Sequence, residues 1–242
     1  MDPGVTGGPN LVLVRHGESE YNARGLLTGW ADPGLTGRGR EQSIAAGRRL
    51  TIDGACADVA FTSMLARARQ TAACLLGAWG RAGIPVTELW ELNERHLGQL
   101  QGLDKRSIRD RWGNAARRRW RDELDALPPP LRADDPRHPS HDPAFDRVPR
   151  RLLPASERLS DLRCRVLAGW RSQIRPALLT GQRVVVVAHR DSLRVLIAEL
   201  EGLDPGLIAG IAVPPASPRR YRVDRAATMP APRVADTAAR QR

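Results

Sequence analysis

Two histidines stand at the ends of apolar runs that are typical of buried strands. His16 follows the run 11–14 with Arg15 in between, and His189 follows the run 184–188. The carboxyl ends of parallel strands meet at one edge of an open α/β sheet, where such folds bind ligands. A neutral imidazole nitrogen is a nucleophile toward phosphorus, and arginine binds phosphate oxygens in pairs. The three side chains together indicate phosphoryl transfer, whereas a single strand-end histidine more often bonds to backbone or caps a helix.

Two further charged side chains fall where they can serve the same reaction. Arg67 is expected in the first turn of a helix that follows the strand 58–63, so it can reach the same phosphate as Arg15. Glu94 lies in a glycine-punctuated loop, 91–102. A carboxylate in a phosphate site transfers protons to and from a hydroxyl once burial raises its pKa toward neutrality. Without its neighbours, the Glu94 loop would be interpreted as a solvated charge cluster.

The elements that must hold these side chains alternate between strands and helices. We expect strands at 11–14, 58–63, 84–88, 183–188, 210–213 and 220–223, helices at 38–52, 65–79, 156–175 and 190–201, and helix caps at Thr36, Ser63 and Ser156. Such alternation predicts an α/β fold of three layers, α/β/α, with a mostly parallel central sheet. We expect one domain over 11–225, a flexible N-terminus, 1–10, and a mobile tail, 226–242.

The segment 111–155 differs in character from the rest of the chain. It begins with a basic, helix-prone run, is interrupted by three consecutive prolines at 128–130, and continues through an irregular stretch rich in Pro, His and Asp, 134–143. The prolines and the irregular spacing argue against a metal site. A disordered insertion or a second small domain are alternatives, but we interpret this segment as an active-site lid, a common role of long irregular insertions.

Composition narrows the classes of partner. The net charge is +11, and every basic residue except Lys105 is arginine. No nucleic-acid motif or aromatic-interleaved basic stripe accompanies that charge, so we expect no nucleic-acid partner. Arginine-rich codon usage explains most of the charge, and attraction of a polyanionic small substrate explains the rest. The solitary Lys105 indicates a position that favours a compact, flexible point charge.

We expect neither a membrane location nor export. No apolar run approaches the roughly 18 residues that a membrane span requires. The residues from Met1 to Gly4 lack the basic and apolar regions of a signal peptide. Cys56, Cys74 and Cys164 are odd in number and lack the spacing of metal ligands, which indicates free thiols in a reducing cytoplasm.

The segment 15–18, Arg-His-Gly-Glu after an apolar strand, resembles the signature of the histidine phosphatase superfamily. Thr62 and Ser63 followed by Arg67 resemble the second phosphate clamp of that superfamily. The resemblance covers about 11–215 of this chain. It implies a phosphoglycerate mutase-like fold and a phosphohistidine on His16.

The loop 91–102 and the insertion 111–155 narrow this resemblance to the 2,3-bisphosphoglycerate-dependent phosphoglycerate mutase family. The features of the insertion that carry it are Trp120-Arg121, the proline run, Asp134-Asp135 and His141-Asp142-Pro143, and the shorter phosphatases lack such an insertion. The resemblance implies an isomerase, an intramolecular phosphotransferase that interconverts 3-phosphoglycerate and 2-phosphoglycerate in glycolysis and gluconeogenesis. It also implies that 2,3-bisphosphoglycerate primes the histidine, that no metal is needed, and that Glu94 manages the hydroxyl proton.

The same resemblance implies roles for individual residues. The expected catalytic residues are Arg15, His16, Arg67, Glu94 and His189. The expected substrate-binding residues are Arg15, Ser19, Asn22, Thr28, Gly29, Arg67, Glu94, Arg95, His96, Leu97, Lys105, Arg121, Asp122, Arg190 and Asp191. The expected partner is a small phosphorylated substrate, and family members are usually homodimers or homotetramers.

The chain departs from the family pattern at four places. The departures are Leu97 for a tyrosine, Arg121-Asp122 for two arginines, Arg190-Asp191 for Gly-Asn, and Pro214-Pro215-Ala216 for Pro-Thr-Gly. All four touch or support the part of the pocket that recognises the carboxylate end of the substrate, while the residues that transfer phosphoryl are intact. We therefore expect a divergent mutase with weak glycolytic activity or a shifted phosphorylated substrate.

Two other functional classes remain as alternatives. In a phosphatase, water attacks the phosphohistidine, and the same core residues would support that reaction. A noncatalytic anion-binding or scaffold protein would form no acid-labile phosphohistidine. The presence of His16, Glu94 and His189 together makes the noncatalytic alternative the weakest.

Overall fold

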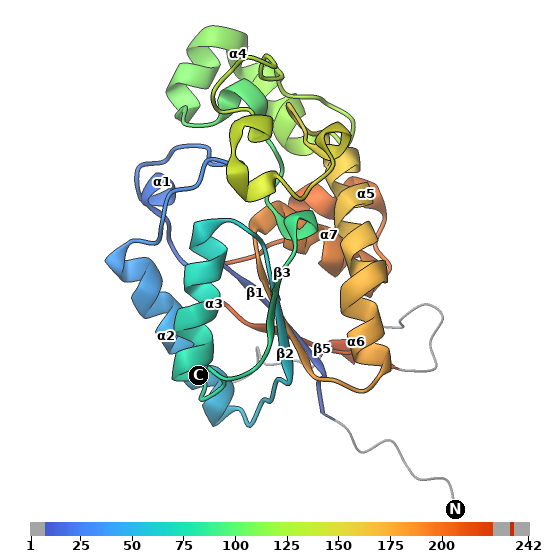
Figure 1. Cartoon of the computed structure of the whole chain (residues 1–242). Helices are drawn as coiled ribbons and strands as arrows, with labels where there is room; N and C mark the ends of the chain where they lie inside the picture. Colours follow the sequence, from blue (N-terminus) through green and yellow to red (C-terminus); the bar gives the residue numbers. More distant parts are fainter. Residues whose placement is uncertain (1–7, 225–232, 235–242) are drawn as a thin grey trace, which may run out of the picture.

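A six-stranded sheet forms the centre of the computed structural model, which describes residues 8–224 and 233–234 (Figure 1). Its strands are β1 (Leu11–Arg15), β2 (Val59–Thr62), β3 (Val86–Glu88), β4 (Val184–Ala188), β5 (Arg219–Arg222) and β6 (Arg233–Val234), in the spatial order β3-β2-β4-β1-β5-β6. Strands β1 to β4 pair in parallel, and β5 pairs antiparallel with both of its neighbours, β1 and β6. The mostly parallel sheet predicted from the sequence is therefore confirmed.

Helices cover both faces of this sheet (Figure 1). The helices are α1 (Glu20–Ala23), α2 (Gly37–Ile52), α3 (Ala66–Ala78), α4 (Lys105–Asp122), α5 (Leu159–Gly169), α6 (Arg175–Leu179) and α7 (Arg190–Glu201), with a π-helical turn, Trp170–Ile174, between α5 and α6. Short 3₁₀ turns span Trp90–Leu92, Gly98–Leu100, Pro139–His141, Pro143–Phe145, Arg150–Leu152 and Pro205–Gly210. None of the helices in the described ranges is long and apolar enough to span a membrane.

The core divides into two layers because successive strand residues point to opposite faces. In β1, Val12 and Val14 pack with residues of α2 and α3 such as Leu50 and Leu75. The alternate residues of β1 pack with α5 and α7 on the other face. The central strands β1 and β4 are apolar along their length because both faces are covered. This arrangement is the expected three-layer α/β/α fold.

Three local expectations were wrong. Ser156 does not cap α5, which begins after Arg158, and its hydroxyl instead donates to the Pro128 carbonyl at 2.8 Å. No strand forms near 210–213, because this segment follows a 3₁₀ turn and presents a carbonyl to the side chain of Arg15. Ser63 precedes α3 but is not its cap, since it bonds to a histidine at the end of β4.

The insertion 111–155 lies entirely within the described residues and gathers with α4 at one end of the molecule (Figure 1). Phe145 and Val148 from it pack with Trp30 and Leu65 in a separate apolar cluster. Helix α4 starts earlier than the basic run suggested, because Asp104 caps it by accepting from the Ser107 amide at 2.6 Å.

The expected termini fall mostly outside the described residues. Residues 1–7, 225–232 and 235–242 are not described. Of the rest, Asn10 accepts from the Val223 amide at 2.8 Å, and 233–234 form β6.

Candidate active site

His16 and His189 lie together because they follow paired positions of neighbouring parallel strands. Arg15 is opposite Ala188 in the β1–β4 register, so the next residue of each strand is a histidine. The two ring centroids are 5.1 Å apart. The register of β1 and β4 therefore places both side chains at one edge of the sheet, as the sequence predicted.

The imidazole of His16 is held in one tautomer. Its Nδ1 lies 2.7 Å from the carbonyl oxygen of Gly17, which can only accept, so Nδ1 carries the proton and Nε2 keeps a lone pair. Burial, followed by the charges of Arg67 and Arg15, lowers the pKa of His16 well below its usual range. The ring is therefore neutral at physiological pH and presents Nε2 as a nucleophile.

His189 lies beside this ring and keeps one unpaired nitrogen. It is fully buried at the N-terminus of α7, and its Nε2 bonds to the Ser63 hydroxyl at 2.6 Å. Its Nδ1 is buried and has no partner among the described residues. Buried polar atoms are rarely left unpaired, so this nitrogen indicates a ligand at the site.

Two arginines surround these rings and bond to backbone carbonyls. Arg67 donates to the Gly29 and Ala31 carbonyls at 2.7 and 2.9 Å, and Arg15 donates to the Val213 carbonyl at 2.9 Å. The Nε atoms of both arginines are buried without a partner in the described part of the chain. Burial lowers the pKa of Arg67 to about 10, so the guanidinium remains positive at neutral pH.

Glu94 contributes a carboxylate to the cavity. Its Oε1 accepts from the amides of Arg95 at 3.0 Å and Asp191 at 3.1 Å. Burial, followed by repulsion from the carboxylate of Asp191, raises the pKa of Glu94 above its usual range. A carboxyl group with a raised pKa is suited to give and take a proton near neutral pH.

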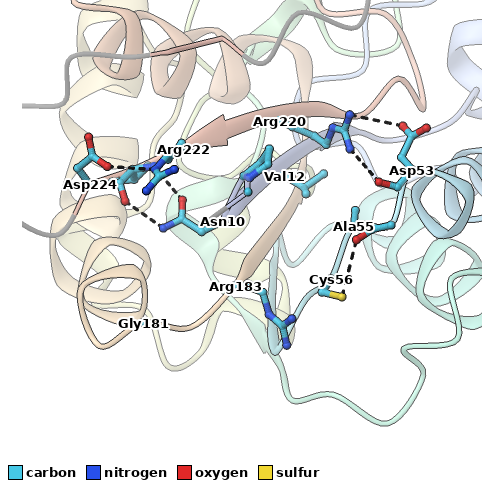
Figure 2. Close-up of a pocket in the computed structure, with 14 residues that line it drawn as sticks. Asn10, Val12, Asp53, Ala55, Cys56, Gly181, Arg183, Arg220, Arg222 and Asp224 are labelled. Atoms are coloured by element: carbon cyan, nitrogen blue, oxygen red, sulfur yellow. Dashed lines mark hydrogen bonds and ion pairs between the residues drawn. The ribbon is translucent and has the colours of Figure 1, made fainter. Parts of the chain in front are cut away.

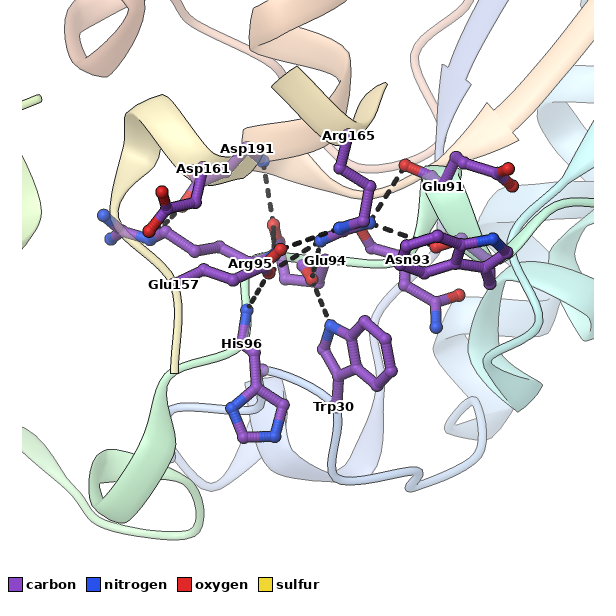
Figure 3. Close-up of polar contacts among 12 residues, drawn as sticks. Trp30, Glu91, Asn93, Glu94, Arg95, His96, Glu157, Asp161, Arg165 and Asp191 are labelled. Atoms are coloured by element: carbon purple, nitrogen blue, oxygen red, sulfur yellow. Dashed lines mark hydrogen bonds and ion pairs between the residues drawn. The ribbon is translucent and has the colours of Figure 1, made fainter. Parts of the chain in front are cut away.

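A buried arginine that the sequence analysis missed holds the Glu94 loop (Figure 3). Arg165 of α5 forms a bidentate ion pair with Glu157, with both bonds at 2.7 Å. It also donates to the backbone carbonyls of Trp90, Glu91, Asn93 and Glu94 at 2.9–3.2 Å. The available signal was an arginine three residues after Leu162, on the apolar stripe of its helix.

Asp191 is a second buried carboxylate, and it is surrounded by arginines. It pairs with Arg194 at 2.9 Å, Arg190 at 3.1 Å and Arg95 at 3.5 Å. Burial alone would raise the pKa of Asp191, but Arg190, Arg95 and Arg194 together lower it below its usual range. Asp191 therefore stays ionised and fixes the directions of these arginines.

The structure brings most of the predicted residues around one small cavity of about 180 Å³. Its lining includes Arg15, His16, Asn22, Thr28, Gly29, Arg67, Glu94, Leu97, Lys105, Arg190 and Asp191. His189 lies against His16, as described above. This cavity combines unpaired donors, a neutral histidine and a carboxylate of raised pKa.

Five predicted substrate-binding residues do not line this cavity. Ser19 is buried and caps α1 by accepting from the Asn22 amide at 3.3 Å. Arg95 is held by Asp191, and His96 packs edge-on against Trp30. The Gly98 amide donates to Nδ1 of His96, and burial lowers the pKa of His96 to about 3.

Arg121 and Asp122 are the remaining pair. They form a bidentate ion pair with each other, with both bonds at 2.7 Å, and both are exposed on α4. Their charges are therefore mutually compensated at the surface. The resemblance placed both residues on the substrate, whereas here each is the other's partner.

Ala216 shows a further consequence of the departures from the family pattern. Its φ of 47° lies in the left-handed region, which it alone adopts among the non-glycine residues in the described ranges. Its amide donates to the Arg15 carbonyl at 2.9 Å. Glycine adopts this conformation without strain, so alanine here strains the segment that supports Arg15.

A larger cavity of about 810 Å³ lies at the opposite end of the strands (Figure 2). It is lined by residues that precede β1 and β4, such as Asn10 and Arg183, and by Arg220 of β5. It contains none of the catalytic candidates. Across 8–224 and 233–234, no group of three or more His, Cys, Asp or Glu side chains is placed to hold a metal ion.

Comparison with known proteins agrees with this geometry. The family model of the histidine phosphatase superfamily (branch 1) matches residues 11–229. This chain therefore belongs to the histidine phosphatase superfamily.

Within that superfamily, the chain is similar to 2,3-bisphosphoglycerate-dependent phosphoglycerate mutases, as the Glu94 loop and the insertion had indicated. It is 42% identical to those of Neisseria meningitidis serogroup C and Haemophilus ducreyi, over 88% of this chain and 94% of each relative. Similar solved structures include Bacillus stearothermophilus YhfR, with a TM-score of 0.69 and 26% identity over 93% of this chain and 94% of that one. A mycobacterial glucosyl-3-phosphoglycerate phosphatase has a TM-score of 0.67 and 25% identity over 88% and 91% of the two chains.

Proposed function

We propose that this protein is a phosphoglycerate mutase that interconverts 3-phosphoglycerate and 2-phosphoglycerate through a phosphohistidine on His16. The observation that carries the proposal is the neutral His16 ring in a cavity that it shares with Arg15 and Arg67, whose Nε atoms are unpaired donors in the described part of the chain. The named relatives at 42% identity support the choice of substrate. The proposed location is the cytoplasm, which suits three free cysteines.

The site suits a small molecule with phosphate groups. Arg15 Nε and Arg67 Nε are buried donors without partners in the described chain, and phosphate oxygens can accept from both. His189 Nδ1 is a donor to a phosphate oxygen in the tautomer in which Ser63 donates to Nε2. When bound, 2,3-bisphosphoglycerate would supply the phosphoryl group that primes His16. The residues that would hold its reacting phosphate are Arg15, Arg67 and His189.

The transfer step follows from these positions. Nε2 of His16 attacks phosphorus in line with the leaving oxygen, so an N–P bond forms while the P–O bond to the sugar acid breaks. The proton on Nδ1 stays with the Gly17 carbonyl, which orients the ring. Arg15 and Arg67 offset the charge on the equatorial oxygens as it develops.

Glu94 completes the proton balance. It donates its proton to the leaving alkoxide as His16 becomes phosphorylated, and it takes the proton from the attacking hydroxyl on the return. Burial and the carboxylate of Asp191 raise its pKa above the usual range, which favours its role as the acid. From the primed state, the phosphoryl group passes from His16 to the free hydroxyl of 3-phosphoglycerate. The resulting bisphosphate returns its other phosphoryl group to His16 and leaves 2-phosphoglycerate.

A second candidate function is a phosphatase, or a mutase that acts on another small phosphorylated metabolite. Leu97 brings no hydroxyl to the cavity, and Arg121 is compensated by Asp122, so the site has fewer groups for a sugar-acid carboxylate than the family pattern has. The phosphatase named among the similar solved structures favours the same alternative. In this case water replaces the substrate hydroxyl in the second step.

Product identification tests the two candidates. Purified protein is incubated with 3-phosphoglycerate and 2,3-bisphosphoglycerate, beside His16→Ala. The proposal predicts 2-phosphoglycerate as the main product, made only by the protein that retains His16. Inorganic phosphate as the main product would establish the phosphatase instead.

A further inference from the structure

We propose that Arg190 is a specificity-determining residue that binds the non-reacting anionic group of the substrate. The inference rests on the proposed function and deepens it by naming the residue that would recognise the second anionic group of the substrate. The second group is a carboxylate or another phosphate.

The position of Arg190 carries the argument. It is the first residue of α7, and it lines the cavity together with Arg15 and Lys105. Its Nε donates to Asp191 at 3.1 Å, whereas its two terminal nitrogens have no hydrogen-bond partner in the described part of the chain. The side chain is 44% exposed, so these donors are open to a ligand.

Arg190 is also held in place from behind. The carboxylate of Asp191 is buried and is anchored by Arg194 at 2.9 Å as well as by Arg190. An arginine whose Nε is already bound loses less freedom when a ligand binds to its other nitrogens. Asp191 therefore acts through Arg190 as a positioning residue.

The charges divide into an inner group and an outer group. The inner group is Arg15 and Arg67, which line the cavity with His16, and His189, whose ring lies 5.1 Å from that of His16. The outer group is Arg190 and Lys105, which bring two further positive charges to the same cavity. A substrate with a single phosphate and an uncharged remainder would leave the outer group unused.

Arg121 is the competing cation, and the structure argues against it. Its guanidinium is engaged by both oxygens of Asp122, and it does not line the cavity. The bond to Asp122 raises the pKa of Arg121. The charge of Arg190 instead acts inside the site, where it lowers the pKa of Arg15 and opposes the rise in the pKa of Glu94. The free outer guanidinium thus comes from Arg190 of α7 and not from Arg121 of α4.

The experiment compares two phosphoryl donors on one nucleophile. Rapid-quench measurements follow phosphorylation of His16 by 2,3-bisphosphoglycerate, which has further anionic groups, and by p-nitrophenyl phosphate, which has none. Arg190→Gln is compared with wild type and with Arg106→Gln, a control on α4 whose side chain is 82% exposed. We expect Arg190→Gln to raise the half-saturating concentration of 2,3-bisphosphoglycerate about 10- to 100-fold, as for one lost charge-assisted contact.

The two donors separate this inference from the proposed function. With p-nitrophenyl phosphate, which cannot make that contact, Arg190→Gln should raise the half-saturating concentration at least about tenfold less than it does with 2,3-bisphosphoglycerate. Equal effects on both donors, no effect on either, or a larger effect of Arg121→Gln would overturn the role of Arg190 while phosphohistidine formation still stands. If wild type forms no phosphohistidine with either donor, the proposed function and this inference both fail.

Discussion

Replacing Arg165 tests how the protein holds its acid–base carboxylate. This side chain is 6% exposed and makes six hydrogen bonds, two to Glu157 and four to the carbonyls of residues 90, 91, 93 and 94. Arg165→Met removes all six and leaves the buried carboxylate of Glu157 with the His96 amide but without a counter-charge from Arg165. The Glu94 loop then loses its hydrogen bonds to Arg165 of α5.

The size of the effect follows from the buried ion pair. Removing one partner of such a pair costs about 3–5 kcal/mol in the free energy of unfolding. Domains of this kind have about 5–15 kcal/mol in total, so the variant should remain folded at 25 °C. In Arg165→Met/Glu157→Gln the charge is gone while an oxygen remains for the His96 amide, and about 1–3 kcal/mol should be recovered.

Urea denaturation measures the stability of the variants, with Arg163→Met as a control. Arg163 is on the same helix, is 37% exposed and contacts Glu199 only at 3.9 Å, so its loss should cost less than about 1 kcal/mol. Activity is measured with two donors: a phosphoglycerate, whose leaving alkoxide needs the Glu94 proton, and p-nitrophenyl phosphate, whose leaving group does not. Displacement of Glu94 lowers the first rate selectively, whereas general unfolding lowers both.

Two results would refute this reasoning. One is an Arg165→Met variant as stable as the Arg163→Met control, because the six bonds would then contribute nothing net. The other is an equal loss of activity with both donors at full folding, because Arg165 would then not act through Glu94.

Three further predictions concern single groups. Glu94→Gln should slow phosphoryl transfer from phosphoglycerates by about 10²- to 10⁴-fold, but transfer from p-nitrophenyl phosphate by less than about tenfold. Steady-state rates that fall equally with both donors would contradict a proton-transfer role for Glu94. Ala216→Gly should raise the free energy of unfolding by about 1 kcal/mol because it relieves a positive φ, and an unchanged urea midpoint would argue against strain. Burial lowers the pKa of His96 to about 3, from about 6.5 in the unfolded chain, so the unfolded state binds more protons below pH 6.5. The contribution of His96 to the free energy of unfolding is therefore full above that pH and falls by about 1.2 kcal/mol between pH 7 and 5.5. His96→Asn should lose this part of the pH dependence, and a slope equal to that of wild type in urea titrations would count against it.

The strand-end chemistry was predictable because it depends on local sequence and on a general rule of sheets. An apolar run that ends in a histidine identifies a strand end, and parallel strands bring such ends together. His16 and His189 meet for this reason, one residue beyond the paired Arg15 and Ala188. The position of Arg67 was predictable for the same reason, because it lies in the first turn of α3, the helix that follows the end of β2.

The direction of side chains in irregular segments was not predictable. Glu94 faces the cavity, whereas His96, two residues further on, packs against Trp30, and the sequence of a loop has no period that separates the two. The pairing of Arg121 with Asp122 was equally hidden, because adjacent opposite charges can bind a ligand or each other. Arg165 was missed because the sequence of a helix does not show that an arginine on its apolar face bonds to the carbonyls of a loop 71–74 residues earlier.

Locating the phosphoryl group on wild-type protein tests the central claim most directly. The protein is treated with 2,3-bisphosphoglycerate, and the phosphorylated residue and its ring nitrogen are determined by tandem mass spectrometry and ³¹P NMR. Because the Gly17 carbonyl binds Nδ1 of His16, the account predicts acid-labile phosphate on Nε2 of His16. Phosphate on Nδ1, on His189, or on no histidine would contradict it.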